Sequence, residues 1–163
     1  MTSRRGACRV ERRVAITGTR SIGDAPDDQL AAAFDAYLRP FADSTAHVYV
    51  GGASGVDTAA LQWLAKNTDA ALSVVVPCRI VDQPTGSATV IEALRDDGRL
   101  AEVVEMGATL LGKTAYHARN RWMVDHADVV IGFPRGDESA GGGTWYTLNY
   151  AAERGKVRVI VPL

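Results

Sequence analysis

Short apolar runs alternate with segments of helical periodicity along almost the whole chain. The apolar runs are the predicted strands, and they cover residues 14–17, 47–50, 71–76, 100–104, 127–133 and 156–162. Strands that alternate with helices form βαβ units, and right-handed crossovers between them make the sheet parallel. We therefore predict an α/β fold: a single doubly wound, mostly parallel, Rossmann-like sheet with helices on both faces.

The length and composition fit one globular domain. A chain of 163 residues, 47% hydrophobic and 23% charged, can bury a sizeable core. We expect this domain over residues 13–163, preceded by a basic, flexible tail over residues 1–12, where arginines are crowded. The net charge of −1 gives no overall basic signal for nucleic acid.

Several other classes of protein are excluded by what the sequence lacks. No apolar run approaches the roughly 20 residues that span a bilayer, and no apolar segment follows the first arginines as in a secretory signal. Cys8 and Cys78 lie far apart, which fits a reducing cytoplasm. His47, His117 and His126 have no metal-ligand spacing, so we predict no metal site. Because no apolar run is long enough to span a bilayer, we also predict no membrane partner.

The unusual residues follow the predicted strands. In a doubly wound parallel sheet, the loops that follow strands gather at the carboxyl edge, where ligands bind. The candidate ligand-binding residues on these loops and the helices that follow are Gly18, Thr19, Arg20, Ser21, Gly52, Ser54, Gly55, Asp57, Arg119, Arg121, Gly141, Gly142, Gly143 and Thr144. Bare backbone N–H groups at helix starts, with hydroxyl and guanidinium groups beside them, favour a phosphate-bearing ligand.

Some of these residues have two readings. Asp57 either complements the dipole of the helix that it begins, or contacts a ribose hydroxyl or a backbone N–H of the site. Arg119 and Arg121 are two apart and cannot share a helix face. We expect one of them to reach the cleft while the other pairs with a carboxylate. Trp145 fits core packing better than stacking on a base.

No catalytic constellation is present in the sequence. The loop over residues 18–23 lacks the middle glycine of the dinucleotide fingerprint, and no Walker A lysine follows a glycine-rich loop. Ser54 is not in a nucleophile elbow, which needs a glycine two residues to either side. We therefore predict no catalytic residue. The one cofactor candidate is a nucleotide ligand, and the sequence does not establish it.

Four motifs together resemble a known family. They are Val14-Ala-Ile-Thr-Gly-Thr-Arg20, Gly51-Gly-Ala-Ser-Gly-Val-Asp57, Arg119-Asn-Arg121 and Gly142-Gly-Thr144. In this order and spacing they resemble the DNA-processing protein DprA, also called Smf. The wider superfamily includes the LOG-type "lysine decarboxylase-like" proteins and the molybdenum cofactor carriers. The resemblance covers about residues 13 to 163.

The resemblance implies roles for the motifs. Gly18 to Ser21 look like the first phosphate loop, and Gly51 to Asp57 look like a Gly-x-x-x-Gly-Ile-Asp loop with Val56 in place of isoleucine. Gly142 to Thr144 look like a Ser-Gly-Thr loop with glycine in place of serine. In DprA this domain binds single-stranded DNA and helps load RecA without being an enzyme. LOG-type enzymes carry a glutamate three residues after the loop threonine, and this chain has Thr147 there.

Three functions follow as hypotheses. The first is binding of a nucleotide or nucleotide-derived ligand, as a sensor or carrier. The alternative is DprA-like binding of single-stranded DNA in DNA processing or recombination, in which Arg20, Arg119, Arg121 and the basic tail would contact phosphates. The third is hydrolysis of a nucleotide N-glycosidic bond, with Asp57 or Glu138 as the acid–base group. Because relatives of this kind are commonly oligomeric, we also expect a homo-oligomer.

Overall fold

The architecture is a parallel sheet, seen in a computed structural model that describes residues 11–23 and 27–163. The first ten residues of the expected tail lie outside the described residues. The strands of the described part are β1 (Arg12–Gly18), β2 (Ala46–Gly51), β3 (Ala71–Val76), β4 (Glu102–Glu105), β5 (Val129–Phe133) and β6 (Val157–Ile160). They pair in the order β4-β3-β2-β1-β5-β6, all in parallel. The α/β prediction is confirmed.

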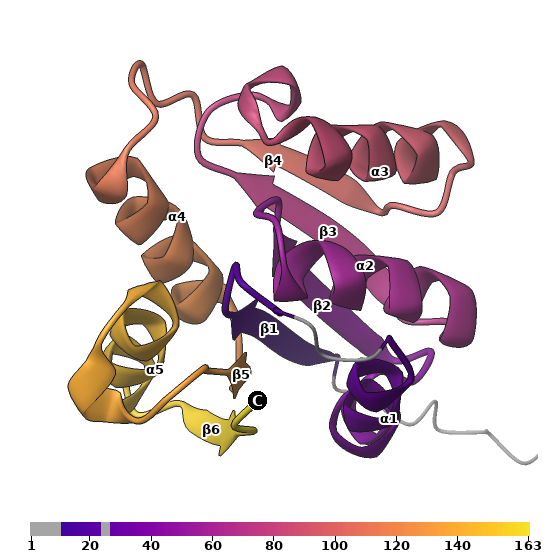
Figure 1. Ribbon diagram of the computed structural model, residues 1–163. Coiled ribbons are helices and arrows are strands. Elements are labelled where there is room, and N and C mark those ends of the chain that lie inside the picture. Colours follow the sequence, from indigo (N-terminus) through magenta and orange to yellow (C-terminus); the bar gives the residue numbers. More distant parts are fainter. Residues whose placement is uncertain (1–10, 24–26) are drawn as a thin grey trace, which may run out of the picture.

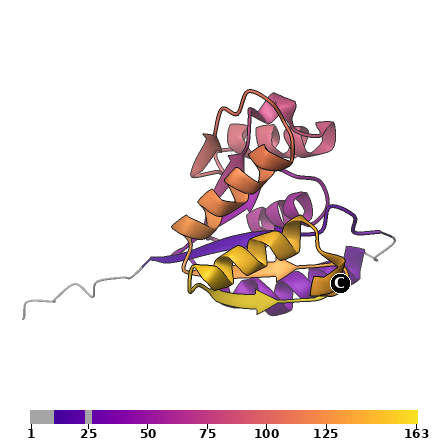
Figure 2. The ribbon, with the colours of Figure 1, turned by 90° about the vertical axis from the view of Figure 1, so that its left-hand side faces the viewer.

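Helices cover both faces of the sheet (Figures 1 and 2). The helices α1 (Asp27–Tyr37), α2 (Val56–Asn67) and α3 (Thr85–Asp96) lie on one face, and α4 (Lys113–His126) and α5 (Gly143–Glu153) on the other. Single turns of 3-10 helix lie at Arg39–Phe41, Ile80–Asp82 and Glu138–Ala140. None of the described helices is long and apolar enough to cross a membrane.

Each face has its own core. Phe34 of α1 packs edge-on against Phe133 at the end of β5, with ring centroids 5.3 Å apart. Both side chains are fully buried, so this contact ties α1 to the strand that leads into the glycine-rich loop. On the other face Met123 of α4 and Leu148 of α5 fill the second core. The two cores hold the ends of β1 and β5 in place.

The strand order creates one topological switch point. The chain steps outward from β1 to β4, then returns through α4 to β5, which pairs with β1 on its free side. The loops after β1 and β5 therefore leave the sheet toward opposite faces, and a crevice opens between them. Gly18 and Phe133 lie side by side at its base, where the two strands end.

Candidate functional site

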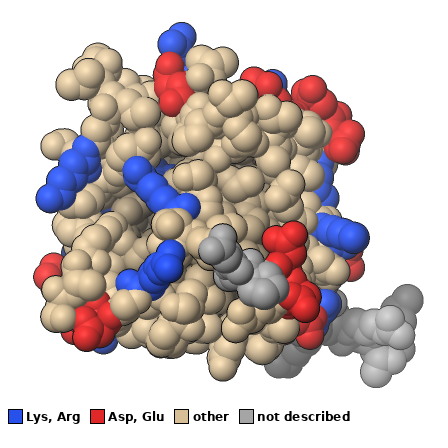
Figure 3. Space-filling view, viewed as in Figure 1, with Lys and Arg blue, Asp and Glu red and all other residues tan. Residues whose placement is uncertain are grey.

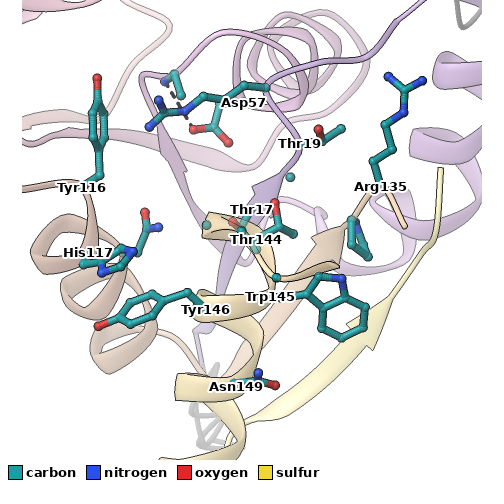
Figure 4. Close-up of a pocket in the computed structure, with 18 of the residues that line it drawn as sticks. Thr17, Thr19, Asp57, Tyr116, His117, Arg135, Thr144, Trp145, Tyr146 and Asn149 are labelled. Carbon is teal, nitrogen blue, oxygen red and sulfur yellow. Dashed lines mark hydrogen bonds between the residues drawn. The ribbon is translucent and has the colours of Figure 1, made fainter. Parts of the chain in front are cut away.

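The crevice at the switch point is a cavity of about 830 Å³. Its walls come from the ends of β1 and β5, the loops that follow them, and the facing sides of α4 and α5 (Figure 4). Ten of the predicted site residues lie on these walls: Gly18, Thr19, Arg20, Ser21, Asp57, Arg119, Gly141, Gly142, Gly143 and Thr144. Thus the predicted loops come together at one place, although they are separated by more than a hundred residues.

Two glycines of the predicted set do not line the cavity. A Cβ atom at Gly52 would overlap the side chain of Val76, so this glycine permits close packing of β2 against β3. Gly55 has a φ of +78°, and a Cβ atom there would meet the backbone carbonyl groups of Thr19 and Arg20. Both glycines shape the loops from behind the cavity.

The other two predicted residues outside the cavity wall are Ser54 and Arg121. Ser54 is exposed within the loop after β2. The Arg121 guanidinium donates a hydrogen bond of 2.7 Å from Nη1 to the Tyr146 hydroxyl. The expectation that this arginine pairs with a carboxylate is therefore wrong. Its partner is the phenol of Tyr146, because the α5 residue that packs opposite Arg121 is a tyrosine.

Backbone hydrogen bonds fix the loop after β1. Thr19 N–H donates to the Phe133 carbonyl at 3.0 Å, and Val56 N–H donates to the Thr19 carbonyl at 3.0 Å. These bonds join the first loop to the end of β5 and to the start of α2. The cavity rim is therefore set by the backbone before any ligand arrives.

A buried ion pair lies at the back of the cavity. Arg119 Nη1 is 3.9 Å from Asp57 Oδ2, and both side chains are more than nine-tenths buried. Arg119 also donates to the Val75 carbonyl at 3.1 Å and to Asn120 Oδ1 at 2.7 Å. Gly51 at the end of β2 is required here, because a Cβ atom would overlap both charged groups.

Burial sets the ionisation of this pair. Burial raises the pKa of Asp57 above its usual value, while the Arg119 guanidinium and the Ala53 N–H bond oppose that shift. Burial likewise lowers the pKa of Arg119, but an arginine pKa starts so far above neutrality that the group stays charged. The pair therefore gives the back wall a fixed guanidinium.

Basic side chains outnumber acidic ones on the cavity wall. Arg20, Lys113, Arg119 and Arg135 line it, against the two carboxylates of Asp57 and Glu138. In Figure 3 basic side chains surround a hollow on this face, and acidic ones lie mostly nearer the margin. The chain as a whole has a net charge of −1, so this positive surface is local.

Two of the basic groups have defined contacts. The Arg20 guanidinium lies 4.1 Å from the centre of the Tyr116 ring, within cation–π range. Arg135 Nη1 donates weakly to the Ser21 carbonyl at 3.4 Å, across the gap between the loops after β1 and β5. The cavity mouth therefore has cations on both of its sides.

The start of α5 opens onto the cavity. Its N-cap is Gly142, with a φ of +99°, so no side chain caps the helix. The first N–H groups of the helix have no acceptor within the helix, and its dipole adds positive potential there. Thr144 and Thr17 lie beside them on the cavity wall as nearly buried residues. This combination is suited to a phosphate group.

The remaining wall is aromatic, which the loop motifs did not predict. The rings of His117 on α4 and Tyr146 on α5 stack with centroids 3.6 Å apart and planes within 6°. Trp145 is half-buried, and its Nε1–H donates to the Gly136 carbonyl at 3.3 Å. Trp145 is therefore not only a core residue, because it pins the glycine-rich loop and lines the cavity.

The α4 residues of the cavity wall could have been found from their spacing in the sequence. Lys113, Tyr116 and Asn120 follow one another at helical spacing, and α4 begins at Lys113. The residue pattern predicts a helix only from Tyr116 to His126, which places Lys113 outside the predicted site. No group of three metal-binding side chains is found in residues 11–23 and 27–163.

Comparisons with known proteins show the family and the fold. The family model of DNA recombination-mediator protein A matches residues 4–163. DNA processing protein A of Helicobacter pylori, whose structure concerns its binding of single-stranded DNA, is 24% identical with a TM-score of 0.67. The alignment covers 94% of this chain and 66% of that one.

A second solved structure is DprA of Streptococcus pneumoniae, which is 22% identical with a TM-score of 0.72. The alignment covers 93% of this chain and 50% of that one, so both relatives are longer. At these identities the two structures show the shared fold. A search of curated proteins found no match. Because the family model spans nearly all of the sequence, the chain belongs to the DNA recombination-mediator protein A family, DprA or Smf.

Proposed function

We propose that this chain binds single-stranded DNA in the switch-point cavity and acts in DNA processing. The observation that carries the proposal is a basic cavity at an uncapped helix start, in a chain of the DprA family. The nucleotide sensor or carrier expected first has no comparable support, because the family match favours the DNA reading.

The phosphates are assigned to two parts of the cavity. One phosphate accepts hydrogen bonds from the first N–H groups of α5, where Gly142 and Gly143 leave the backbone uncovered. Arg20 and Lys113 at the wall then neutralise the next phosphate along the strand. Arginine and lysine supply this attraction without reading the sequence.

The form of the DNA follows from the aromatic groups. The Arg20 guanidinium lies over the Tyr116 ring at the cavity wall. A base that stacks on the tyrosine ring would therefore lie close to a positive charge. Bases in a duplex already stack on each other, whereas bases of a single strand are free to stack on protein rings. The mixture of cations and rings therefore favours single strands over duplex DNA.

The test is a titration of a labelled 20-nucleotide single strand, followed by fluorescence anisotropy at several salt concentrations. We expect log K to fall with log salt by about 0.7 per phosphate neutralised. Arg20→Ala should weaken binding about tenfold and flatten the slope by about one contact. Arg79→Ala is the matched control, because Arg79 follows β3 at the same edge, outside the cavity, and pairs with Asp82 at 3.1 Å.

Three results would contradict the proposal. The first is no binding at low salt, and the second is equal loss in the Arg20 and Arg79 variants. The third is that a mononucleotide binds as tightly as the oligonucleotide, with no salt slope, which would restore the nucleotide-carrier reading. The homo-oligomer stays a prediction, tested by light scattering across a protein concentration series.

A further inference from the structure

The stack of His117 on Tyr146 has no role in the phosphate contacts just described. Both residues line the cavity, one from α4 and one from α5. In Figure 4 the His117 ring lies against Tyr146, and Tyr116 and Asp57 lie on its other side, around the cavity that all four residues line. One face of the imidazole is therefore covered by the tyrosine, and the other faces the cavity.

The stack is held from behind. The Tyr146 hydroxyl accepts the hydrogen bond from Arg121 at 2.7 Å, which fixes the tyrosine ring between the two helices. The nearly parallel planes, 6° apart, then orient the imidazole. A flat ring that cannot turn loses little entropy when another ring stacks on it.

The charge on His117 also suits a flat apolar contact. Partial burial, and the positive charges of Lys113 and Arg121, lower the pKa of His117 below its usual value. This lowered pKa favours the neutral imidazole at pH 7. In a cavity whose other wall groups include four cations, this neutral ring is a poor partner for phosphate but a good one for a base.

We propose that the open face of His117, backed by Tyr146, is a stacking platform for one nucleobase of the bound strand. The inference rests on the proposed binding of single-stranded DNA, and adds a base contact on the α4–α5 side of the cavity. Stacking of this kind tolerates all four bases, since each offers a flat π face.

The test compares two oligonucleotides of equal length with wild-type protein and variants. One carries its bases, and the other has abasic tetrahydrofuran sugars at every position, so both present the same phosphates. His117→Ala should weaken binding of the base-bearing strand about tenfold. The abasic strand should be affected less than about twofold, since its phosphate contacts are unchanged.

A second histidine on the same helix provides the control. His126 stacks on Trp122 with centroids 3.7 Å apart, but it lies outside the cavity. His126→Ala should leave binding of both strands unchanged. His117→Phe keeps a ring and should keep the preference for bases, whereas His117→Leu should lose it, which covers the case in which the alanine variant fails to fold.

The outcomes separate the two proposals. Equal weakening of both strands by His117→Ala, or weakening of neither, overturns the stacking platform while single-strand binding stands. Loss of the base preference in His126→Ala also overturns it. If wild-type protein binds neither strand, the proposed function itself has failed.

Discussion

Arg119→Met is expected to lower the free energy of unfolding by about 3–5 kcal/mol at neutral pH. The substitution removes the guanidinium that lies 3.9 Å from Asp57 and leaves a carboxylate that is more than nine-tenths buried without its cation. The hydrogen bond to the Val75 carbonyl is lost as well. Urea unfolding at pH 7, followed by circular dichroism, measures the change.

The loss should depend on pH in a defined direction. Burial already raises the folded-state pKa of Asp57, and removal of Arg119 takes away the main group that opposes this shift. Below the unfolded-state value of about 3.9 the carboxyl is neutral in both states, so burying its charge costs nothing. The cost grows as the pH rises through the raised folded-state pKa. The effect of Arg119→Met should therefore be smaller near pH 4 than at pH 7.

The matched control is Arg154→Met. Arg154 pairs with Asp125 at 3.1 Å, but both side chains are more than a third exposed. An exposed pair contributes at most about 1 kcal/mol. Asp57→Asn added to Arg119→Met should recover part of the lost stability, because it removes the unpaired charge. Equal losses in the two arginine variants, or a loss that does not change with pH, would contradict this account of the back wall.

Gly55→Ala is expected to cost about 2–5 kcal/mol and to disturb the loop after β1. The φ of +78° at Gly55 is strained for any residue with a Cβ atom. In addition, that atom would lie against the carbonyl groups of Thr19 and Arg20, which are backbone and cannot rotate away. Thermal unfolding and DNA titration of the same samples measure both effects.

Gly98→Ala separates strain from collision. Gly98 has a similar φ of +68°, but nothing lies within 4 Å of a Cβ atom built there. Its replacement should cost only the backbone term of about 1–2 kcal/mol and leave DNA binding unchanged. If the two glycine variants lose equal stability, the close approach of the loops after β1 and β2 is not what requires Gly55.

Periodicity predicted the fold well where burial was complete. The strand over residues 71–76 matches β3 at both ends, because every residue after the first is buried and all of them except Ser73 are apolar. The edge strands β4 and β6 are shorter than the apolar runs 100–104 and 156–162, since each has a neighbour on one side only. The proline at position 26 also predicts a helix entry over residues 24–26, and these residues lie outside the described ones.

The candidate site was predictable where it depends on local backbone chemistry. The glycines before α5 and the loop from Gly18 to Ser21 are visible in sequence because they follow apolar strands. The stack of His117 on Tyr146 is not, since it depends on how α4 packs against α5. Helical spacing separated Arg119 from Arg121, but only the packing of α4 shows which of them faces the cavity.

The net charge of the whole chain was a poor guide to the choice between the proposed functions. A net charge of −1 over 163 residues hides a cavity wall with four basic and two acidic side chains. The sequence therefore favoured a small nucleotide ligand over DNA, and the comparisons favour the DNA reading. The charges that line the cavity indicate the ligand better than the net charge of the chain does.

The most direct test of the central claim is a crystal structure of this chain with a short oligothymidine. The account predicts one phosphate within hydrogen-bond distance of the backbone N–H groups at the start of α5. It also predicts a second phosphate near Arg20 and a thymine on the open face of His117. A strand bound on the face of α1 to α3, with the switch-point cavity left without DNA, would contradict it.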